Sequence, residues 1–200
     1  MRKYFLPITI IFLILAFDII LMSFNQQKTI YQINKDNSLK FPAFQTKDIK
    51  GNIVTDEILY GKISLICVWV IKDADTSREL LTELSKLQKK LPMNIQFIGL
   101  IGDLKENDNF IKIDLVKKIT YNCSNDFLQL MVNDDFSDFL TRLHNAPTIC
   151  FIDERGNIIG QPIIGNELNL IQKEIMYLIE KDSPRTRALN RIQHDIFNRS

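Results

Sequence analysis

The sequence predicts an α/β fold behind a single N-terminal transmembrane helix, and three observations lead to this prediction. Residues 63–71 and 95–101 are unbroken runs of apolar and β-branched residues, which is typical of strands buried on both faces of a sheet. Between them, leucines recur at helical spacing. Residues 4–24 form an apolar stretch long enough to span a bilayer as a helix.

Composition limits what the chain can be. It has 200 residues, 46% of them hydrophobic, which suffices for one domain of ordinary size with appendages. Its 25 basic and 24 acidic residues nearly cancel, so no overall charge attracts nucleic acid, and we expect no nucleic-acid partner.

The apolar stretch predicts where the chain resides. Arg2 and Lys3 precede it, and positively charged ends stay on the cytoplasmic side, so we expect the rest of the chain to be exported. We therefore predict a signal anchor over residues 1–24, single-pass in the cytoplasmic membrane, with a cleaved signal peptide as the alternative. Asp18 lies six residues from the end of the stretch, where it either reaches the outer interface or contacts another membrane protein.

The first half of the exported part is predicted in chain order. A polar tether covers residues 25–38, and a domain of residues 39–182 follows. It opens with strands 41–44, 45–49 and 53–55, the last two forming a hairpin. Thr76 and Glu79 form a capping box that starts a helix ending at Pro92. This helix joins strands 63–71 and 95–101, which implies a parallel pair.

The second half continues with shorter elements. Helices are expected over residues 107–121, 134–144 and 167–179, and strands over 127–132, 148–153 and 158–164. Residues 183–200 form a basic tail, either an amphipathic helix that binds a membrane surface or a partner, or a solvated extension.

Four short motifs, in this order and spacing, give the chain a family resemblance. They are Phe41-Pro42-Ala43-Phe44, Gly61-Lys62-Ile63-Ser64-Leu65-Ile66-Cys67-Val68-Trp69, Asn145-Ala146-Pro147-Thr148 and Phe151-Ile152-Asp153-Glu154-Arg155-Gly156-Asn157-Ile158. The chain resembles the thioredoxin-like redoxins of the TlpA and ResA type, which are membrane-tethered, extracytoplasmic thiol-disulfide oxidoreductases. The resemblance implies a thioredoxin-like fold, with a central mixed sheet flanked by helices, and a cis peptide bond before Pro147.

The departure from that family lies at its redox site. The resemblance puts the two cysteines of a C-x-x-C motif at Asp73 and Thr76, and no cysteine lies between Cys67 and Cys123, so no shift of the alignment restores the motif. We therefore expect no catalytic residue here. Asp73 is expected to occupy the helix N-terminus where a thiolate would lie, and Thr76 to cap the helix.

A binding groove is the remaining site prediction. The resemblance implies that Trp69, Ala146 and Pro147 line a groove in which an extended polypeptide pairs by strand addition. The alternative is that Pro147 only shapes the entrance of the sheet. His144 and His194 have no other ligand at metal-binding spacing, so no metal and no cofactor are expected.

The three cysteines are predicted to differ. Cys67 and Cys150 lie in apolar runs and are expected to be buried in the core, with a disulfide between them as an alternative, because the resembled fold pairs their strands. Cys123 lies in a polar segment and is the candidate for an exposed, reactive thiol.

Two functions follow. The first is an exported, membrane-anchored thioredoxin-like module that has lost dithiol chemistry and binds a protein or peptide partner outside the cytoplasmic membrane. The alternative is a thiol-disulfide oxidoreductase that works through a lone cysteine such as Cys123. A gene that has lost its function with its active site is a third possibility and predicts poor folding.

Overall fold

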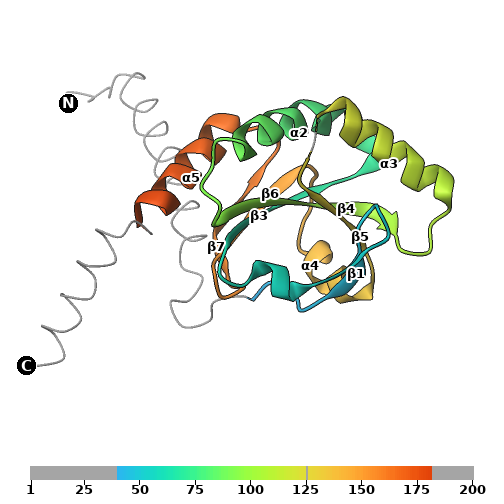
Figure 1. The fold of residues 1–200 in the computed structure, drawn as a ribbon, viewed down its shortest axis with the longest axis horizontal. Coiled ribbons are helices and arrows are strands. Elements are labelled where there is room, and N and C mark those ends of the chain that lie inside the picture. The colour runs from blue at the N-terminus through green and yellow to red at the C-terminus, as the bar shows by residue number, and fades with distance from the viewer. Residues whose placement is uncertain (1–39, 125, 182–200) are drawn as a thin grey trace, which may run out of the picture. The chain divides into compact units, whose positions relative to one another are not determined.

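The central feature is a five-stranded mixed sheet, seen in a computed structural model that describes residues 40–124 and 126–181 (Figure 1). The strand order is β5-β4-β3-β6-β7. Strands β3, β4 and β5 are parallel, whereas β6 and β7 run antiparallel to them and to each other as a hairpin. This confirms the predicted mixed sheet. Their bounds are β3 (Ile63–Trp69), β4 (Ile95–Lys105), β5 (Leu128–Val132), β6 (Thr148–Ile152) and β7 (Ile158–Ile164).

Two layers cover the sheet (Figure 1). One face packs against the helices α2 (Ala74–Gln88), α3 (Phe110–Asn122) and α5 (Leu168–Lys181). The other packs against α4 (Ser137–Thr141), the hairpin of β1 (Gln45–Lys47) and β2 (Ile53–Thr55), and the short helices η1 (Asp56–Leu59) and η3 (Asp134–Phe136). A third short helix, η2 (Ile71–Asp73), leads from β3 into α2.

The two cores differ in composition. On the α2–α3–α5 face, leucines and isoleucines of the helices meet the sheet. On the opposite face, phenylalanine rings pack edge to edge or tilted: the ring centroids of Phe41 and Phe139 are 4.8 Å apart, and those of Phe44 and Phe136 are 5.0 Å apart. Such pairs stabilise a core beyond their buried area. Residues 41–44 therefore form no strand, contrary to the prediction, because their two rings fill this core from an irregular segment.

One other predicted element needs correction: the helix expected over residues 134–144 is replaced by the short helices η3 and α4. The helix expected over residues 107–121 is present as α3, where Phe110 and Leu115 are exposed, while Val116 and Ile119 reach the core.

Two hairpin turns are stabilised in the same way, by an aspartate that accepts hydrogen bonds from backbone N–H groups of the turn. In the turn from β1 to β2, the Asp48 carboxylate accepts hydrogen bonds from the N–H groups of Lys50 (2.9 Å) and Asn52 (2.8 Å). In the turn from β6 to β7, Asp153 does the same for Arg155 (2.9 Å) and Asn157 (2.8 Å). The glycines before the asparagines have φ of +92° and +82°, a conformation that disfavours any side chain with a Cβ.

Both edges of the sheet are blocked. Along the outer edge of β5, Thr46 Oγ1 donates to the Met131 carbonyl (2.8 Å) and the Ile49 N–H donates to the Gln129 carbonyl (3.0 Å). On the other edge, β7 carries Pro162, which has no N–H to offer a further strand.

The predicted anchor 1–24, tether 25–38 and tail 183–200 lie outside the described residues. Within residues 40–124 and 126–181, no helix combines the length and apolarity that a membrane crossing needs.

Candidate functional site

The candidate site begins where β3 ends and α2 starts. Asp103, close to the end of β4, pins this loop: its Oδ1 accepts from the Ile71 N–H (2.7 Å) and its Oδ2 from the Lys72 N–H (3.2 Å). The Lys112 ammonium of α3 in turn donates to the Asp103 carbonyl and to Asp108 (2.9 Å), which holds the pKa of Asp108 below its ordinary value. The loop is thereby tied to β4 and α3.

Asp73 and Thr76, where the resemblance puts the two cysteines, lie at the start of α2, and both side chains are exposed. Asp73 is the N-cap residue by position, as predicted, but its side chain makes no capping hydrogen bond. Thr76 lies inside the first turn of the helix, so the predicted capping box does not form. The helix starts two residues before Thr76, at Ala74, because η2 leads directly into it. The carboxylate of Asp73 is left available at the positive end of the α2 dipole.

The opposite wall of the site is the loop that carries the cis peptide bond between Ala146 and Pro147, as expected. This loop is fixed on both sides: Thr148 Oγ1 donates to the Asn145 carbonyl (2.6 Å) and the Gly165 N–H donates to the Pro147 carbonyl (2.8 Å). Pro147 itself is buried and Ala146 is half-buried. Within the described part of the chain, the backbone N–H and carbonyl of Ala146 have no hydrogen-bond partner.

A pocket of about 340 Å³ joins these two walls. We call it the site groove. It lies between the β3–α2 loop, the end of β4, α4 and the cis-proline loop. Its lining residues are Val68, Val70, Lys72, Asp73, Gly102, Leu140, Leu143, His144, Asn145 and Ala146. The structure thus brings Asp73 and Ala146 to one pocket, but Thr76, Trp69 and Pro147 do not line it.

Trp69 has a structural position instead of the predicted one in the groove. Its side chain is 0% exposed, so it cannot contact a partner. The indole Nε1 donates to Gln129 Oε1 (3.0 Å) inside the core. Gly99 of β4 makes room for this contact, because a Cβ at that position would overlap the Gln129 amide. Sequence reasoning missed Gln129, although the glycine inside an apolar strand was a signal of close approach.

The structure contradicts the prediction for Cys123 and confirms that Cys67 and Cys150 are buried. Cys123 is 0% exposed and its Sγ lies 3.6 Å from the Arg78 carbonyl of α2, so the prediction of an exposed thiol is wrong. Cys67 and Cys150 are buried as expected. Burial raises the pKa of both thiols to about 12, with the nearby Cys150 adding to the effect on Cys67.

The alternative of a disulfide between Cys67 and Cys150 is ruled out by register. Their strands are antiparallel neighbours, but Ile66 pairs with Cys150 and Cys67 with Ile149. Successive residues point to opposite faces of a sheet, so the two thiols lie in different cores, one under α2 and the other under α4. Both remain free.

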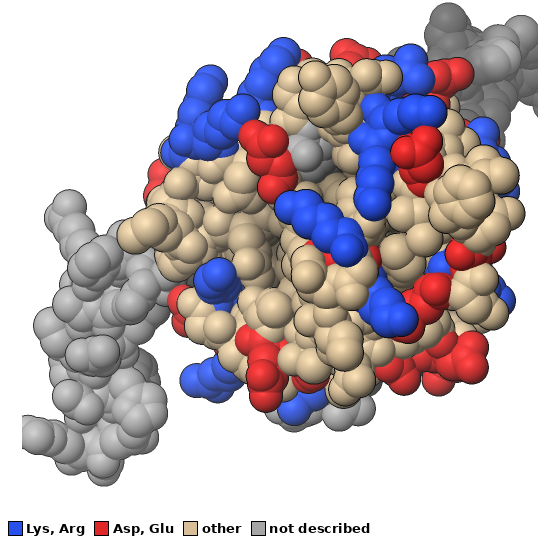
Figure 2. Space-filling model, turned by 45° about the vertical axis from the view of Figure 1, so that its right-hand side comes forward, with Lys and Arg blue, Asp and Glu red and all other residues tan. Residues whose placement is uncertain are grey.

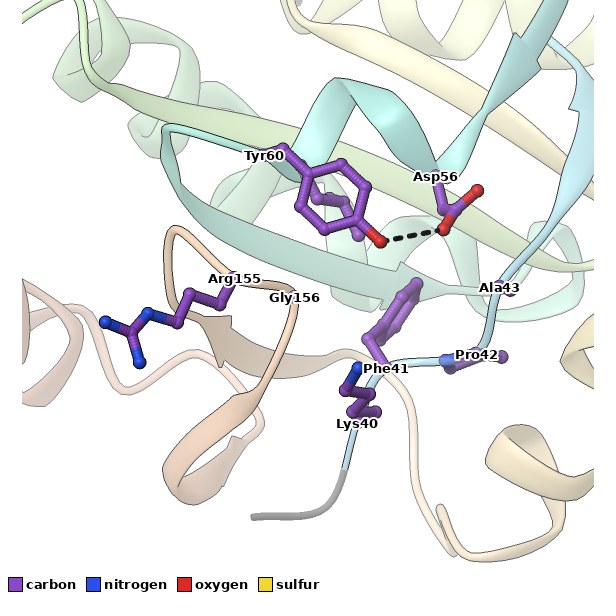
Figure 3. A pocket seen from close by; sticks show the side chains of 9 residues that line it. Lys40, Phe41, Pro42, Ala43, Asp56, Tyr60, Arg155 and Gly156 are labelled. Carbon is purple, nitrogen blue, oxygen red and sulfur yellow. Dashed lines mark hydrogen bonds between the residues drawn. The ribbon is translucent and has the colours of Figure 1, made fainter.

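A second pocket, of about 320 Å³, lies at the other end of the sheet, where β3 begins (Figure 3). Phe41 and Tyr60 form its walls, and the Tyr60 hydroxyl donates to Asp56 (3.3 Å). Arg155 points away from it (Figure 3). No group of three or more His, Cys, Asp or Glu side chains that could hold a metal occurs among the described residues.

Comparisons with known proteins identify the fold. No family model matches the chain, and no curated protein matches its sequence. Solved structures do match. The thioredoxin domain of a thiol-disulfide oxidoreductase from Bacteroides vulgatus is 20% identical, with a TM-score of 0.55, covering 71% of this chain and 99% of that one.

Two further structures agree. A thiol:disulfide interchange protein of the thioredoxin family from Chlorobium tepidum has 17% identity and a TM-score of 0.58, covering 72% of this chain and 98% of that one. A thiol-disulfide isomerase from Corynebacterium glutamicum has 17% identity and a TM-score of 0.55, covering 70% and 97%. The chain therefore has a thioredoxin-like fold.

Proposed function

We propose that this chain is a thioredoxin-like binding module, anchored in the cytoplasmic membrane with its domain outside, that holds an extended polypeptide in the site groove and performs no dithiol exchange. One observation carries the proposal: Asp73 and Thr76, to which the resemblance assigns the cysteine pair, are exposed at the start of α2, and no thiol lines the groove. Disulfide exchange requires a thiolate in reach of the substrate, and neither oxygen side chain supplies one.

The backbone of the cis-proline loop supports the binding role. Strand addition needs an N–H and a carbonyl that are not already used, at a position a second chain can reach. Ala146 meets this requirement, because both its groups lack a partner among the described residues and it lines the groove. The blocked edges at β5 and β7 leave the groove as the place where an extended segment is expected to pair.

The lone-thiol alternative finds no support in the site. Cys67, Cys123 and Cys150 are all buried. A thiol with a pKa near 12, as in Cys67 and Cys150, is almost entirely protonated at neutral pH and is a poor nucleophile. The proposed export and membrane anchoring are supported by the sequence of residues 1–24, where an apolar run follows two basic residues.

Two measurements on the full chain test the proposal. The first is insulin reduction in the presence of dithiothreitol: the expected rate equals the rate without protein. The second is photo-crosslinking, with benzoylphenylalanine placed at exposed Asn145 in the groove and, as a matched control, at exposed Asn169 on α5. The probe is biotinylated, carboxymethylated α-lactalbumin, which is unfolded and has no free thiol.

We expect adducts from position 145 and none from position 169. Catalysed insulin reduction that disappears when the cysteines are replaced by serine contradicts the loss of redox chemistry. Equal labelling from both positions, or none from either, contradicts the binding role.

A further inference from the structure

We infer that the site groove selects a segment with an aliphatic side chain flanked by lysine or arginine. This inference rests on the proposed function, because it names the kind of polypeptide that the groove accepts. It follows from two independent properties of the groove: an apolar floor that is closed to charge, and an excess of carboxylates around its rim.

The floor of the groove is apolar. Val68 and Val70 come from the end of β3, and Leu140 and Leu143 from α4 and the residues after it. Gly102 adds no side chain, and a Cβ there would stand 3.4 Å from a methyl group of Val70 and 3.8 Å from one of Val68, which would raise the floor. A pocket of about 340 Å³ admits one aliphatic side chain together with its backbone. Burying that side chain removes apolar surface from water on both partners.

A charged side chain has no partner on this floor. The ten lining residues include one lysine, Lys72, and one carboxylate, Asp73, and both lie on the β3–α2 loop with exposed side chains. A carboxylate or ammonium that entered between Val68 and Leu143 would lose its hydration without gaining an ion pair. The occupant of the floor is therefore uncharged.

The rim is acidic. The segments after β3, β4 and β5 meet at one end of the sheet, because these strands are parallel. Residues 70–75, 102–109 and 133–147 carry eight carboxylates, Asp73, Asp75, Asp103, Glu106, Asp108, Asp134, Asp135 and Asp138, against three cations, Lys72, Lys105 and Arg142. Two of the eight are paired with cations that lie just outside these ranges, Asp75 with Arg78 and Asp108 with Lys112. Figure 2 turns this side of the molecule forward, and acidic side chains gather along its lower right margin.

Three of these carboxylates lie shortly before the groove residue Leu140 along the chain, outside the lining of the pocket. Asp134, Asp135 and Asp138 are exposed and precede Leu140 on the η3–α4 segment. None forms a salt bridge with a cation in the described part of the chain. A segment paired with Ala146 that runs along α4 brings its own lysines or arginines toward them.

Synthetic peptides test this on the full chain by fluorescence anisotropy. Three fluorescein-labelled peptides share one frame: Lys-Ser-Thr-Leu-Ser-Thr-Lys, the same peptide with glutamate at both ends, and the lysine peptide with serine in place of leucine. We expect the lysine–leucine peptide to bind about tenfold more tightly than either of the others. Its advantage over the glutamate peptide should shrink as salt is raised, whereas its advantage over the serine peptide should not.

Variants of the chain assign each preference to its residues. Leu143→Ser should remove the preference for leucine, and the control Leu170→Ser, on the exposed side of α5, should not. Replacing Asp134, Asp135 and Asp138 by asparagine should remove the preference for lysine. The matched control replaces exposed Glu57, Glu154 and Glu167 by glutamine. Thermal unfolding of each variant separates lost binding from lost folding.

Equal binding of all three peptides overturns the inference but leaves the proposed function, since the groove would then accept any extended segment. Tighter binding of the glutamate or serine peptide also overturns it. If no peptide binds, the inference fails, and the cross-linking from position 145 decides separately on the proposed function.

Discussion

At the scale of single residues, several aspartates stabilise turns and loops of this domain by accepting hydrogen bonds from backbone N–H groups. Asp48 and Asp153 each close a hairpin by accepting N–H groups from the turn that follows, and Asp103 does the same for the β3–α2 loop. A carboxylate that accepts several N–H groups is held in its charged form. At Asp48 the pKa of the carboxyl is lowered in this way, so the turn from β1 to β2 links stability to pH.

Asp48→Ala should lower the free energy of unfolding by about 2 kcal/mol, because it leaves the turn N–H groups of Lys50 and Asn52 without their acceptor. The measurement is urea denaturation of the full chain, followed by the fluorescence of its single tryptophan. Asp114→Ala is the control: this exposed carboxylate pairs only with Lys118, and its removal should cost less than about 0.5 kcal/mol.

The effect of Asp48 should also depend on pH. Burial opposes the charged form, but hydrogen bonds from the Asn52 side chain and from the turn N–H groups prevail, and the pKa of Asp48 lies below its ordinary 3.8. A lowered folded pKa contributes stability that is complete above the unfolded pKa and is lost as pH falls through the folded one. The difference between the native chain and Asp48→Ala should thus be constant near neutral pH and shrink below about pH 3.8. A difference that grows on acidification contradicts this.

At the scale of elements, the loop between β3 and α2 positions the groove, and it depends on β4. Asp103 holds the Ile71 and Lys72 N–H groups, so the loop is ordered by a carboxylate about thirty residues further along the chain.

Asp103→Ala should free these two N–H groups and speed their hydrogen exchange by about tenfold, as local opening becomes easier. Exchange measured by NMR on the same sample shows whether α2 as a whole keeps its protection. Asp75→Ala, which removes only an exposed pair with Arg78, should leave both amides unchanged. Equal acceleration in the two variants would show that Asp103 does not pin the loop.

The sequence predicted the elements whose pattern is local. Strands β3 and β4, helix α2 and the β6–β7 hairpin follow from apolar runs, leucine spacing and a glycine turn. The cis bond before Pro147 followed from the resemblance alone. The elements that were predicted wrongly depend on contacts with distant residues: residues 41–44 form a short apolar run that was read as a strand, but their phenylalanines pack against rings from η3 and α4.

The predictions for two candidate site residues were wrong for the same reason. Cys123 has polar neighbours on both sides, yet the last turn of α3 turns its thiol toward α2. Trp69 was assigned to the groove by resemblance, although strand parity places it on the same face as Leu65 and Cys67, which the helices cover. Parity could have corrected Trp69 from the sequence, whereas nothing local reveals the packing of Cys123.

At the scale of the whole molecule, its cysteine thiols are confined to the interior. Cys67, Cys123 and Cys150 are buried among apolar side chains, and register keeps the first and the last in different cores. The fold protects all three from reagents in solution.

Native chain should therefore react with a maleimide at least ~100-fold more slowly than chain unfolded in guanidinium, because reaction requires opening of the core. Mass spectrometry counts the labelled thiols and should find three only after unfolding. Ser137→Cys, which places a thiol at an exposed position, serves as the positive control and should react at once in the native chain. Rapid labelling of Cys123 without denaturant contradicts the structure.

The blocked edges of the sheet affect whether the domain associates with itself at high concentration. A domain that binds polypeptides by strand pairing can also associate with copies of itself, because each free edge strand of its sheet can pair with a strand of another molecule. Here Pro162 blocks pairing at the β7 edge of the sheet, and the segment around Thr46 and Ile49 covers the β5 edge. The proposed polypeptide binding is thereby separated from self-association, and we expect the domain to stay monomeric at high concentration, as size-exclusion chromatography would show.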